Sequence, residues 1–292
     1  MMHYRLLLAT TICALLIHAH SSHHGTPPFY RITKPGSADT SYVFGTLHLL
    51  EGGFVDTMKT VMSALRSSDE VVGELVLDSS STSDAMQAIF SGPRLDSLLT
   101  EEQYHAVSKV VKSYVHLPLM VLDHTEPVVI YTMILAGMYQ KEHPENHKTG
   151  VPMDLFFEQE AQRLGKKVIG LESAEGQEQL LDSIPMDEQI ADLMELVSNP
   201  KKAMKDMNTM LADYRTGNIE RILDDPSFGS LSSNERGALI DDRNKNWTDT
   251  LPTLMTGHRL FIAVGAGHLP GKNGLLEGLK KEGFQVTPVP PN

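Results

Sequence analysis

Two histidines occupy equivalent places after two apolar segments of the sequence. His48 ends the segment Val43-Phe44-Gly45-Thr46-Leu47-His48, and His268 ends the segment Phe261-Ile262-Ala263-Val264-Gly265-Ala266-Gly267-His268. A buried strand that ends in glycine lets the backbone turn sharply, so the next polar side chain reaches the edge of the sheet. A single histidine at a strand end is more often a hydrogen-bonded structural residue. The repeated Gly-x-x-His spacing predicts two imidazoles at one edge, where they could share a divalent metal ion.

Glu74 is the second unusual residue, because it stands inside the apolar segment Val71-Val72-Gly73-Glu74-Leu75-Val76-Leu77. A carboxylate is costly to bury without a partner, so Glu74 must face solvent, a cation or a metal. It faces water if its strand lies at the edge of the sheet. Together with His48 and His268 it would form a two-histidine, one-carboxylate ligand set that leaves positions open for water and substrate. A metal with an open position acidifies water, and Glu74 could be the third ligand or the general base.

Three further polar residues are candidates for the same site. Glu172 ends the apolar segment Val168-Ile169-Gly170-Leu171 and is a candidate additional ligand or supporting residue. Arg243 shares one face of a predicted helix with apolar residues, so it needs a carboxylate partner such as Glu74 or Glu172. It could instead orient Glu74 or clamp a substrate carbonyl. Asp154 is a candidate catalytic residue, although a carboxylate at a helix start also satisfies free backbone N–H groups.

The elements that must position these residues alternate between strand and helix. Strand-like segments at 30–33 and 41–47 flank Pro35-Gly36 and predict an N-terminal β-hairpin. Helical spacing at 55–66 followed by a strand at 70–77 predicts a strand-helix-strand unit with a parallel pair of strands. A helix at 154–165 and a strand at 167–172 repeat the pattern, and a helix at 234–254 precedes strands at 259–264 and 284–289.

We therefore predict an α/β fold, in which a parallel-rich mixed sheet is opened by the N-terminal hairpin and flanked by helices. Residues 27–292 would form a single domain, with helical cap segments at about 84–145 and 187–232. The chain has 292 residues, of which 41% are hydrophobic and 21% charged, which is ordinary globular composition.

Charge and cysteine content exclude several classes of protein. The 37 acidic and 25 basic residues give a formal net charge of −12, and no Lys/Arg cluster suggests a nucleic-acid groove. The only cysteine, Cys13, lies in the N-terminal segment that we predict below to be a signal peptide. The mature chain would therefore have no disulfide, no thiol nucleophile and no cysteine-based zinc site. The sequence also lacks a Gly-x-Ser-x-Gly nucleophile turn, a Walker-type phosphate loop and a His-Glu-x-x-His motif.

The first 22 residues have the pattern of a secretory signal peptide. A short basic start that includes Arg5 precedes an apolar core from Leu6 to Ile17, which is too short to span a bilayer comfortably. No later segment approaches the length of a transmembrane helix, so we expect no integral membrane segment after signal removal. A mature chain without cysteine folds independently of redox conditions, which fits a periplasmic or secreted protein.

These motifs resemble, in order, those of the TraB/GumN/TIKI family. The resemblance rests on Gly45-Thr46-Leu47-His48, Gly73-Glu74, Met153-Asp154, the stretch from Gly165 to Gln177, Arg243-Asn244-Lys245-Asn246-Trp247 and Val264-Gly265-Ala266-Gly267-His268-Leu269. Each motif is short, but the set spans most of the mature chain.

The resemblance implies a fold like that of erythromycin esterase and the haem-binding ChaN proteins. It also implies a divalent-metal-dependent peptidase site, with His48, His268 and Glu74 carried over by position and Mn, Co or Zn as the ion. We therefore expect an exported metal-dependent hydrolase, namely a peptidase that acts on a peptide or small-molecule substrate. The alternative is a non-catalytic protein that holds a peptide or haem in the same cleft.

Overall fold

The computed structural model describes residues 28–76, 92–144, 151–173, 175–176, 179, 184–224 and 237–292. The predicted signal peptide at residues 1–22 lies outside these residues, as do parts of both predicted cap segments. In the described part of the chain, no helix is long and apolar enough to cross a membrane.

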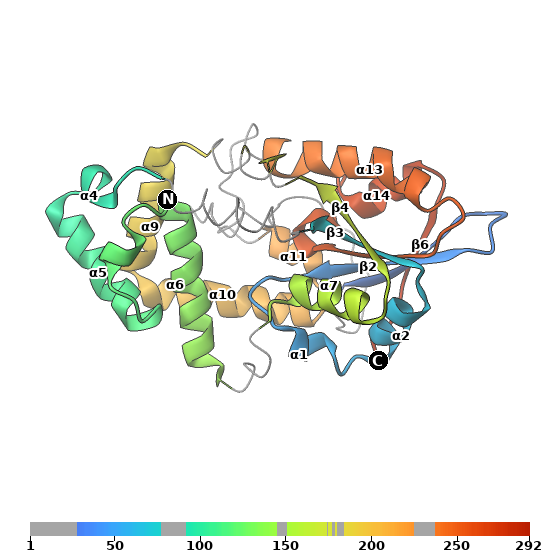
Figure 1. The fold of residues 1–292 in the computed structure, drawn as a ribbon, viewed down its shortest axis with the longest axis horizontal. Helices are drawn as coiled ribbons and strands as arrows, with labels where there is room; N and C mark the ends of the chain where they lie inside the picture. The colour runs from blue at the N-terminus through green and yellow to red at the C-terminus, as the bar shows by residue number, and fades with distance from the viewer. Residues whose placement is uncertain are drawn as a thin grey trace.

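A six-stranded sheet forms the centre of the molecule (Figure 1). Its strands are β1 (Phe29–Thr33), β2 (Thr40–Thr46), β3 (Glu70–Leu75), β4 (Lys167–Glu172), β5 (Leu260–Gly265) and β6 (Gln285–Pro288), in the spatial order β4-β3-β5-β2-β1-β6. Strands β2, β5, β3 and β4 are parallel to their neighbours, whereas β1 pairs antiparallel with both β2 and β6. This topology confirms the predicted parallel-rich mixed sheet opened by a β-hairpin.

Strand β5 lies between β2 and β3, which corrects the predicted pairing of the first strand-helix-strand unit. β2 and β3 are parallel, but each pairs with β5 and not with the other. β5 is entirely buried and apolar, so it gains most from the centre of the sheet, where helices cover both faces. The register Thr46↔Gly265 places the ends of the two Gly-x-x-His segments side by side.

Helices cover both faces of the sheet (Figure 1). One face carries α13 (Asp242–Leu254) and α14 (Leu275–Lys281), and the other carries α1 (Gly52–Val55), α2 (Lys59–Ser67) and α7 (Met153–Arg163). The helix predicted at 55–66 corresponds to α2, which begins later, at Lys59, after the separate short helix α1 has ended at Val55. The helix predicted up to residue 254 begins, within the described residues, as a π-helical turn, η3 (Gly237–Asp241), that leads into α13.

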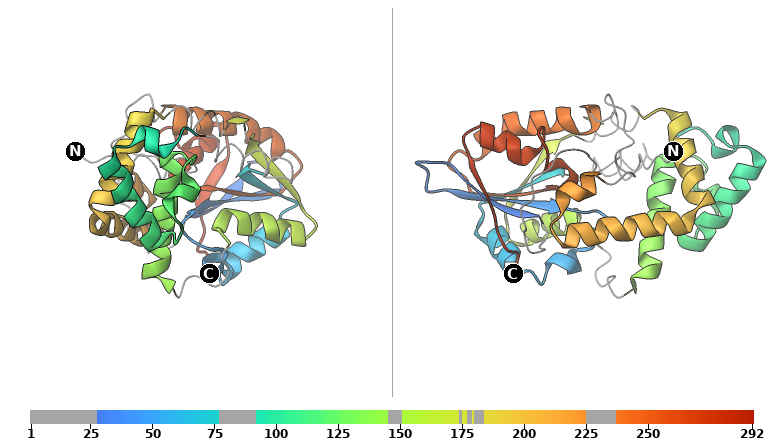
Figure 2. Two further views of the ribbon diagram at one scale, coloured as in Figure 1. Left: turned by 60° about the vertical axis from the view of Figure 1, so that its left-hand side comes forward. Right: turned by 180° about the vertical axis from the view of Figure 1, so that it is seen from behind.

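Most of the remaining helices form a lobe beside the sheet (Figures 1 and 2). They are α4 (Leu95–Leu98), α5 (Glu101–Tyr114), the 3-10 helix η1 (Leu119–Leu122), α6 (Pro127–Glu142), α9 (Met186–Ser198) and α10 (Pro200–Arg215), whereas α11 (Ile219–Asp224) follows α10 and lies next to the strands. A capping box begins α5: the Gln103 N–H donates to the Thr100 hydroxyl, and the Thr100 N–H donates to the side-chain oxygen of Gln103.

Helix α10 joins the lobe to the sheet. It starts against α6 and α9 and ends, after 16 residues, beneath the sheet near β2 (Figure 2). A helix of that length spans about 24 Å, enough to reach from the lobe to the sheet. The end of α10 and the following helix α11 therefore adjoin the strand ends that carry the predicted site.

Candidate functional site

The predicted site residues come together at the carboxyl ends of β2, β3 and β5. His48 follows β2 by two residues, and His268 ends the 3-10 helix η4 (Ala266–His268), which directly follows β5. Glu74 lies in β3, which is an interior strand, so it does not face water as an edge residue would. Glu74 is only 8% exposed and His268 is fully buried. The parallel direction of these strands explains why residues so distant in sequence meet at one edge.

Arg243 of α13 is the centre of the buried part of the site. Its Nε and Nη2 donate to the two oxygens of Glu172 at 2.6 and 3.0 Å, and Nη2 also donates to Glu74 Oε2 at 2.7 Å. Its Nη1 donates to the Leu239 carbonyl at 3.3 Å and to His268 Nε2 at 3.1 Å. A guanidinium has five N–H groups, and these five contacts use all of them. Arg243 therefore orients Glu74 and Glu172 and has no N–H group left for a substrate carbonyl.

The hydrogen bonds also define the state of His268. Because a guanidinium can only donate, Nε2 of His268 must accept, and Nδ1 carries the proton that it donates to Asn244 Oδ1 at 2.8 Å. Asn244 in turn donates from Nδ2 to the Asn273 carbonyl at 2.9 Å. Burial, helped by the charges of Arg243 and His48, lowers the pKa of His268 well below its usual value. His268 is thus a neutral imidazole in a defined tautomer.

Burial and the neighbouring charges shift the pKa values of Glu74 and Arg243. Burial raises the pKa of Glu74, although Arg243, His48 and the backbone N–H of Gly265 oppose this shift. The Gly265 N–H donates to Glu74 Oε1 at 2.7 Å, so both oxygens of Glu74 have a donor. Burial acts to lower the pKa of Arg243, but Glu74 and Glu172 outweigh it and raise that pKa. Arg243 therefore stays charged. Removing Arg243, or removing its glutamate partners, would leave an unpaired charge buried.

Trp247 completes the wall around Arg243 and His268. Its ring centroid lies 4.3 Å from that of His268, and the Arg243 guanidinium lies 4.9 Å from the Trp247 ring. Its Nε1 donates to Glu172 Oε1 at 3.0 Å. Trp247 lies one turn after Arg243 on α13, and that helical spacing is the sequence signal that places them together.

His48 and Asp154 form the accessible part of the site. His48 Nδ1 lies 2.5 Å from Asp154 Oδ2, with 31% of the His48 side chain and 24% of the Asp154 side chain exposed. Asp154 lies in the first turn of α7, which begins at Met153, and does not precede the helix as a cap. Burial acts to raise the pKa of Asp154, but the charge and hydrogen bond of His48, with a hydrogen bond from Thr46, outweigh it and lower that pKa.

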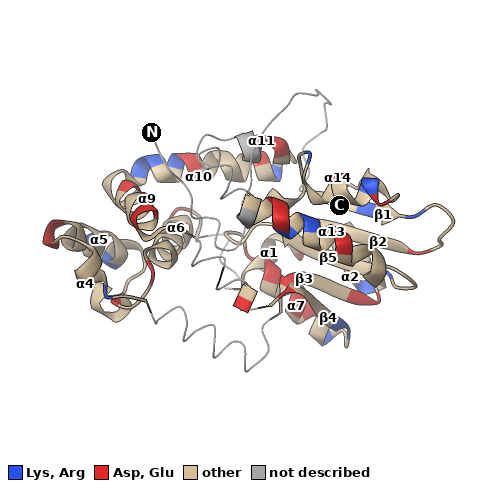
Figure 3. Cartoon of the chain, turned by 90° about the horizontal axis from the view of Figure 1, so that it is seen from above, with Lys and Arg blue, Asp and Glu red and all other residues tan. Residues whose placement is uncertain are grey.

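Glu158 is a site residue that the sequence reasoning missed. It lies one turn after Asp154 on α7, and its Oε1 is 3.8 Å from the place that a Cβ on Gly73 would take. Burial, with a contribution from the negative charge of Asp154, raises the pKa of Glu158 to about 7. Acidic residues gather on β3 and α7 (Figure 3). The i, i+4 spacing of Asp154 and Glu158 was the available signal.

The described residues do not assemble the predicted metal ligand set. Among them, no group of three or more His, Cys, Asp or Glu side chains is placed to hold a metal ion. His268 Nε2 and Glu74 Oε2, which would have to face such an ion, both accept from Arg243. The guanidinium thus lies where the lone pairs of these two residues converge. The assignment of His48, His268 and Glu74 as metal ligands stays a prediction.

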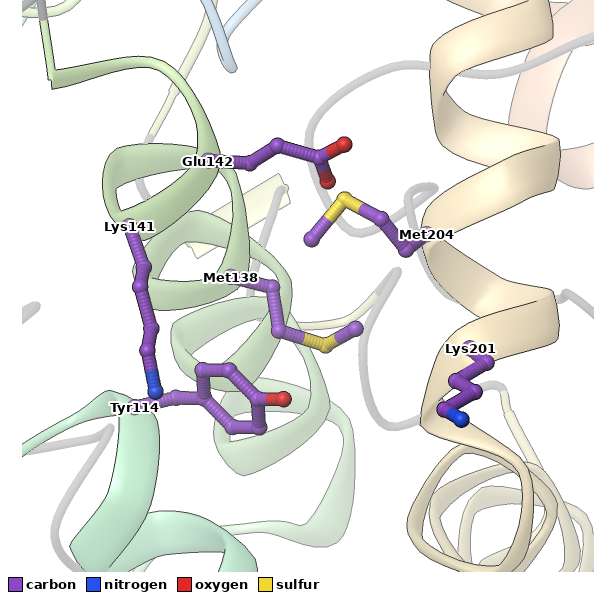
Figure 4. A pocket seen from close by; sticks show the side chains of 6 residues that line it. All are labelled: Tyr114, Met138, Lys141, Glu142, Lys201 and Met204. Atoms are coloured by element: carbon purple, nitrogen blue, oxygen red, sulfur yellow. The ribbon is translucent and has the colours of Figure 1, made fainter.

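A pocket of about 310 Å³ lies away from this site, between α5, α6 and α10 of the lobe (Figure 4). The side chains that line it are those of Tyr114, Met138, Lys141, Glu142, Lys201 and Met204. Met138 and Met204 point toward each other across it (Figure 4). No residue of the strand-end site takes part in the lining of this pocket.

Comparison with known proteins places the chain in a family. It matches the TraB/PrgY/gumN family over residues 28–288, and the chain therefore belongs to that family. It is 24% identical over 314 residues to metalloprotease TIKI2 of Danio rerio, an alignment that covers 90% of this chain and 61% of that protein. It is also 24% identical over 303 residues to metalloprotease TIKI1 of Homo sapiens, which covers 86% of this chain and 60% of that protein.

A third relative, metalloprotease TIKI1 of Danio rerio, is 24% identical over 339 residues, which covers 94% of this chain and 68% of that protein. The chain thus spans only about three fifths to two thirds of the length of these relatives. The family confirms the resemblance inferred from the motifs, and the names of the relatives indicate proteolysis as the reaction class to test.

Proposed function

We propose that this protein is an exported hydrolase that cleaves peptide bonds at the carboxyl ends of β2, β3 and β5. The observation that carries the proposal is the accessible His48–Asp154 pair beside a buried, hydrogen-bonded cluster of Arg243, Glu74 and His268. Accessible reactive groups supported by a fixed polar interior are typical of catalytic sites. The metalloprotease relatives support peptides as the substrate class, and the leader-like start of the sequence supports export.

His48 is the residue that would activate water. Asp154 lies against His48 Nδ1, so whenever the ring is neutral its lone pair is on Nε2, the nitrogen that would take a proton from the attacking water. Asp154 stabilises the imidazolium that forms. The same Nε2–H then protonates the amine that leaves when the peptide C–N bond breaks. This general acid–base role contributes about 10²–10⁴-fold in enzymes that use it.

The buried cluster would hold this pair in place. Glu74 and His268 are fixed by Arg243, and their strands end next to the loop that carries His48. Their hydrogen bonds cost nothing to organise during the reaction, because they exist before substrate binds. In this reading Arg243 acts through Glu74, Glu172 and His268 and does not contact the substrate.

A divalent metal, which the names of the relatives imply, does not fit the donor atoms as they are arranged. An ion at His268 Nε2 and Glu74 Oε2 would need the lone pairs that hold the Arg243 guanidinium. It would also stand next to the buried positive charge of Arg243. We therefore assign no catalytic step to Mn, Co or Zn, and metal dependence is one arm of the test.

The test is peptide hydrolysis by the purified mature protein, followed by mass spectrometry on a mixture of peptides. The protein is measured after chelation and again with added Mn²⁺, Co²⁺ or Zn²⁺. Turnover should fall by at least about 10²-fold in His48→Ala and in Asp154→Asn. His258→Ala is the matched control, because His258 is exposed beside the opposite end of β5.

Folded protein that cleaves no peptide with or without metal would refute the proposal. So would turnover that His48→Ala retains in full. Stable capture of a peptide without products would instead support a binding protein that uses the same strand ends.

A further inference from the structure

Tyr214 is a buried tyrosine of α10 that lies beside the strand-end site. It lies in the last turn of α10, the helix that connects the lobe to the sheet, and it is fully buried. Its ring packs against Phe54 of α1, with the ring centroids 6.1 Å apart. Burial, with a contribution from the charge of Asp154, raises the pKa of Tyr214 well above its usual value, so its hydroxyl keeps its proton.

The hydroxyl of Tyr214 contacts the two segments that carry the accessible pair. It donates to the Gly45 carbonyl at 2.6 Å and lies 3.6 Å from Met153 Sδ. Gly45 precedes His48 by three residues, and Met153 directly precedes Asp154. The hydroxyl oxygen of Tyr214 therefore contacts the chain three residues before His48 and one residue before Asp154.

Gly45 is well suited to transmit a displacement, because its backbone is fixed from several sides. Its N–H donates to the Pro28 carbonyl at 2.8 Å, and it pairs with Val264 of β5. A Cβ added at Gly45 would come within 2.7 Å of Pro28 and 2.8 Å of Leu269. Glycine is needed here for close approach, and a shift of the Tyr214 hydroxyl would have to move the end of β2.

We propose that Tyr214 is a positioning residue that couples the helical lobe to the His48–Asp154 pair. It holds the end of β2 and the start of α7 at a fixed separation, so the place of α10 relative to the sheet sets the geometry of the two side chains. This inference rests on the proposed function, in which that pair carries the proton transfer. A lobe that moves when substrate binds would then change the alignment of His48 through one hydrogen bond.

The test removes that hydrogen bond and keeps the ring. Tyr214→Phe should lower kcat by about tenfold or more with little change in KM, because misplaced catalytic groups lose rate more than binding. The matched control is Tyr104→Phe, which deletes a 2.8 Å hydroxyl bond to Asp123 inside the lobe. Tyr104→Phe should leave kcat unchanged. A Tyr214→Phe variant with wild-type kcat would overturn the inference.

A second readout separates positioning from a general loss of stability. The imidazole ¹⁵N resonances of His48 report its tautomer and its pKa, and both should change in Tyr214→Phe at a temperature where the variant is fully folded. The measurement needs no turnover, so it tests the coupling even if the protein cleaves no peptide. Unchanged His48 resonances would refute the coupling and leave the proposed function standing.

A variant that keeps the hydroxyl is useful if Tyr214→Phe does not fold. Phe54→Leu removes the ring that packs against Tyr214 but retains the hydrogen bond from the Tyr214 hydroxyl to the Gly45 carbonyl. It should change the His48 resonances in the same direction and lower kcat by a smaller factor than Tyr214→Phe. No change in either quantity would count against the inference.

Discussion

Replacing Glu158 by glutamine gives the sharpest stability test of the site's electrostatics. Burial and the neighbouring charge of Asp154 raise the pKa of Glu158 from 4.5 to about 7. Between these two pH values the folded protein binds a proton that the unfolded chain has released. The Glu158 contribution to the free energy of unfolding is therefore fully favourable below about pH 4.5 and is lost as the pH rises to about 7. Glutamine has nearly the same shape and does not titrate.

The size of the effect follows from the shift. Converting the whole change at about 1.4 kcal/mol per pH unit would give about 3 kcal/mol. The Glu158 side chain is partly exposed, and solvent screens its interaction with Asp154. We therefore expect the unfolding free energy of Glu158→Gln, measured relative to that of wild type, to rise by about 1–2 kcal/mol as the pH increases from 5 to 8.

Urea unfolding at pH 5, 6, 7 and 8 measures this difference, with Glu160→Gln as the matched control on the same helix. Both oxygens of the Glu160 carboxylate accept hydrogen bonds from Arg163, and these bonds lower the pKa of Glu160. The ordinary pKa of Glu160 is 4.5 and the folded protein lowers it, so Glu160 is ionised in both states from about pH 6 upward, where its variant should run parallel to wild type. A Glu158→Gln profile that is also parallel to wild type, or that diverges in the opposite direction, would refute the reasoning.

Three further predictions concern packing, the buried arginine and metal. Gly137→Ala should lower the unfolding free energy by several kcal/mol in urea, because a Cβ there would meet the Tyr114 carbonyl at 2.2 Å; Ala136→Gly, with only its helix-propensity cost of about 1 kcal/mol, is the control. Arg243→Lys should cost about 3 kcal/mol in the same assay, since an ammonium cannot replace the five-bond guanidinium; an unchanged midpoint would contradict this. Trp247, the single tryptophan, should show no saturable fluorescence change when Mn²⁺, Co²⁺ or Zn²⁺ is added, and a stoichiometric change would mean that an ion displaces Arg243.

The Arg243 cluster also explains why residue types alone suggested a metal centre. Two histidines and a glutamate at strand ends are a reasonable ligand set on chemical grounds. The same groups equally satisfy a guanidinium, which offers five donors in a planar fork. Which cation they hold depends on the side chain that α13 brings over the sheet. The relatives are named metalloproteases, so metal analysis of this protein is a direct comparison with them.

Several features of this protein could be determined from its sequence alone, because they depend on local pattern. The apolar strands that end in glycine predicted where β2 and β5 end, and the helical spacing of Arg243 and Trp247 placed both on one buried face. The order of short motifs identified the family. In each case the signal is the periodicity or spacing of residues within one element, which needs no knowledge of what the element packs against.

Other features were decided only by tertiary structure. The sequence does not specify that β5 enters the sheet between β2 and β3, and this insertion is what brings His268 beside Glu74. It left open whether Arg243 would bind Glu74, Glu172 or a substrate, and the packed structure joins it to both carboxylates. No local pattern marks Tyr214, whose partner is 169 residues away in the chain. Contacts between distant elements depend on how helices and strands pack, so they become visible only once the chain is folded.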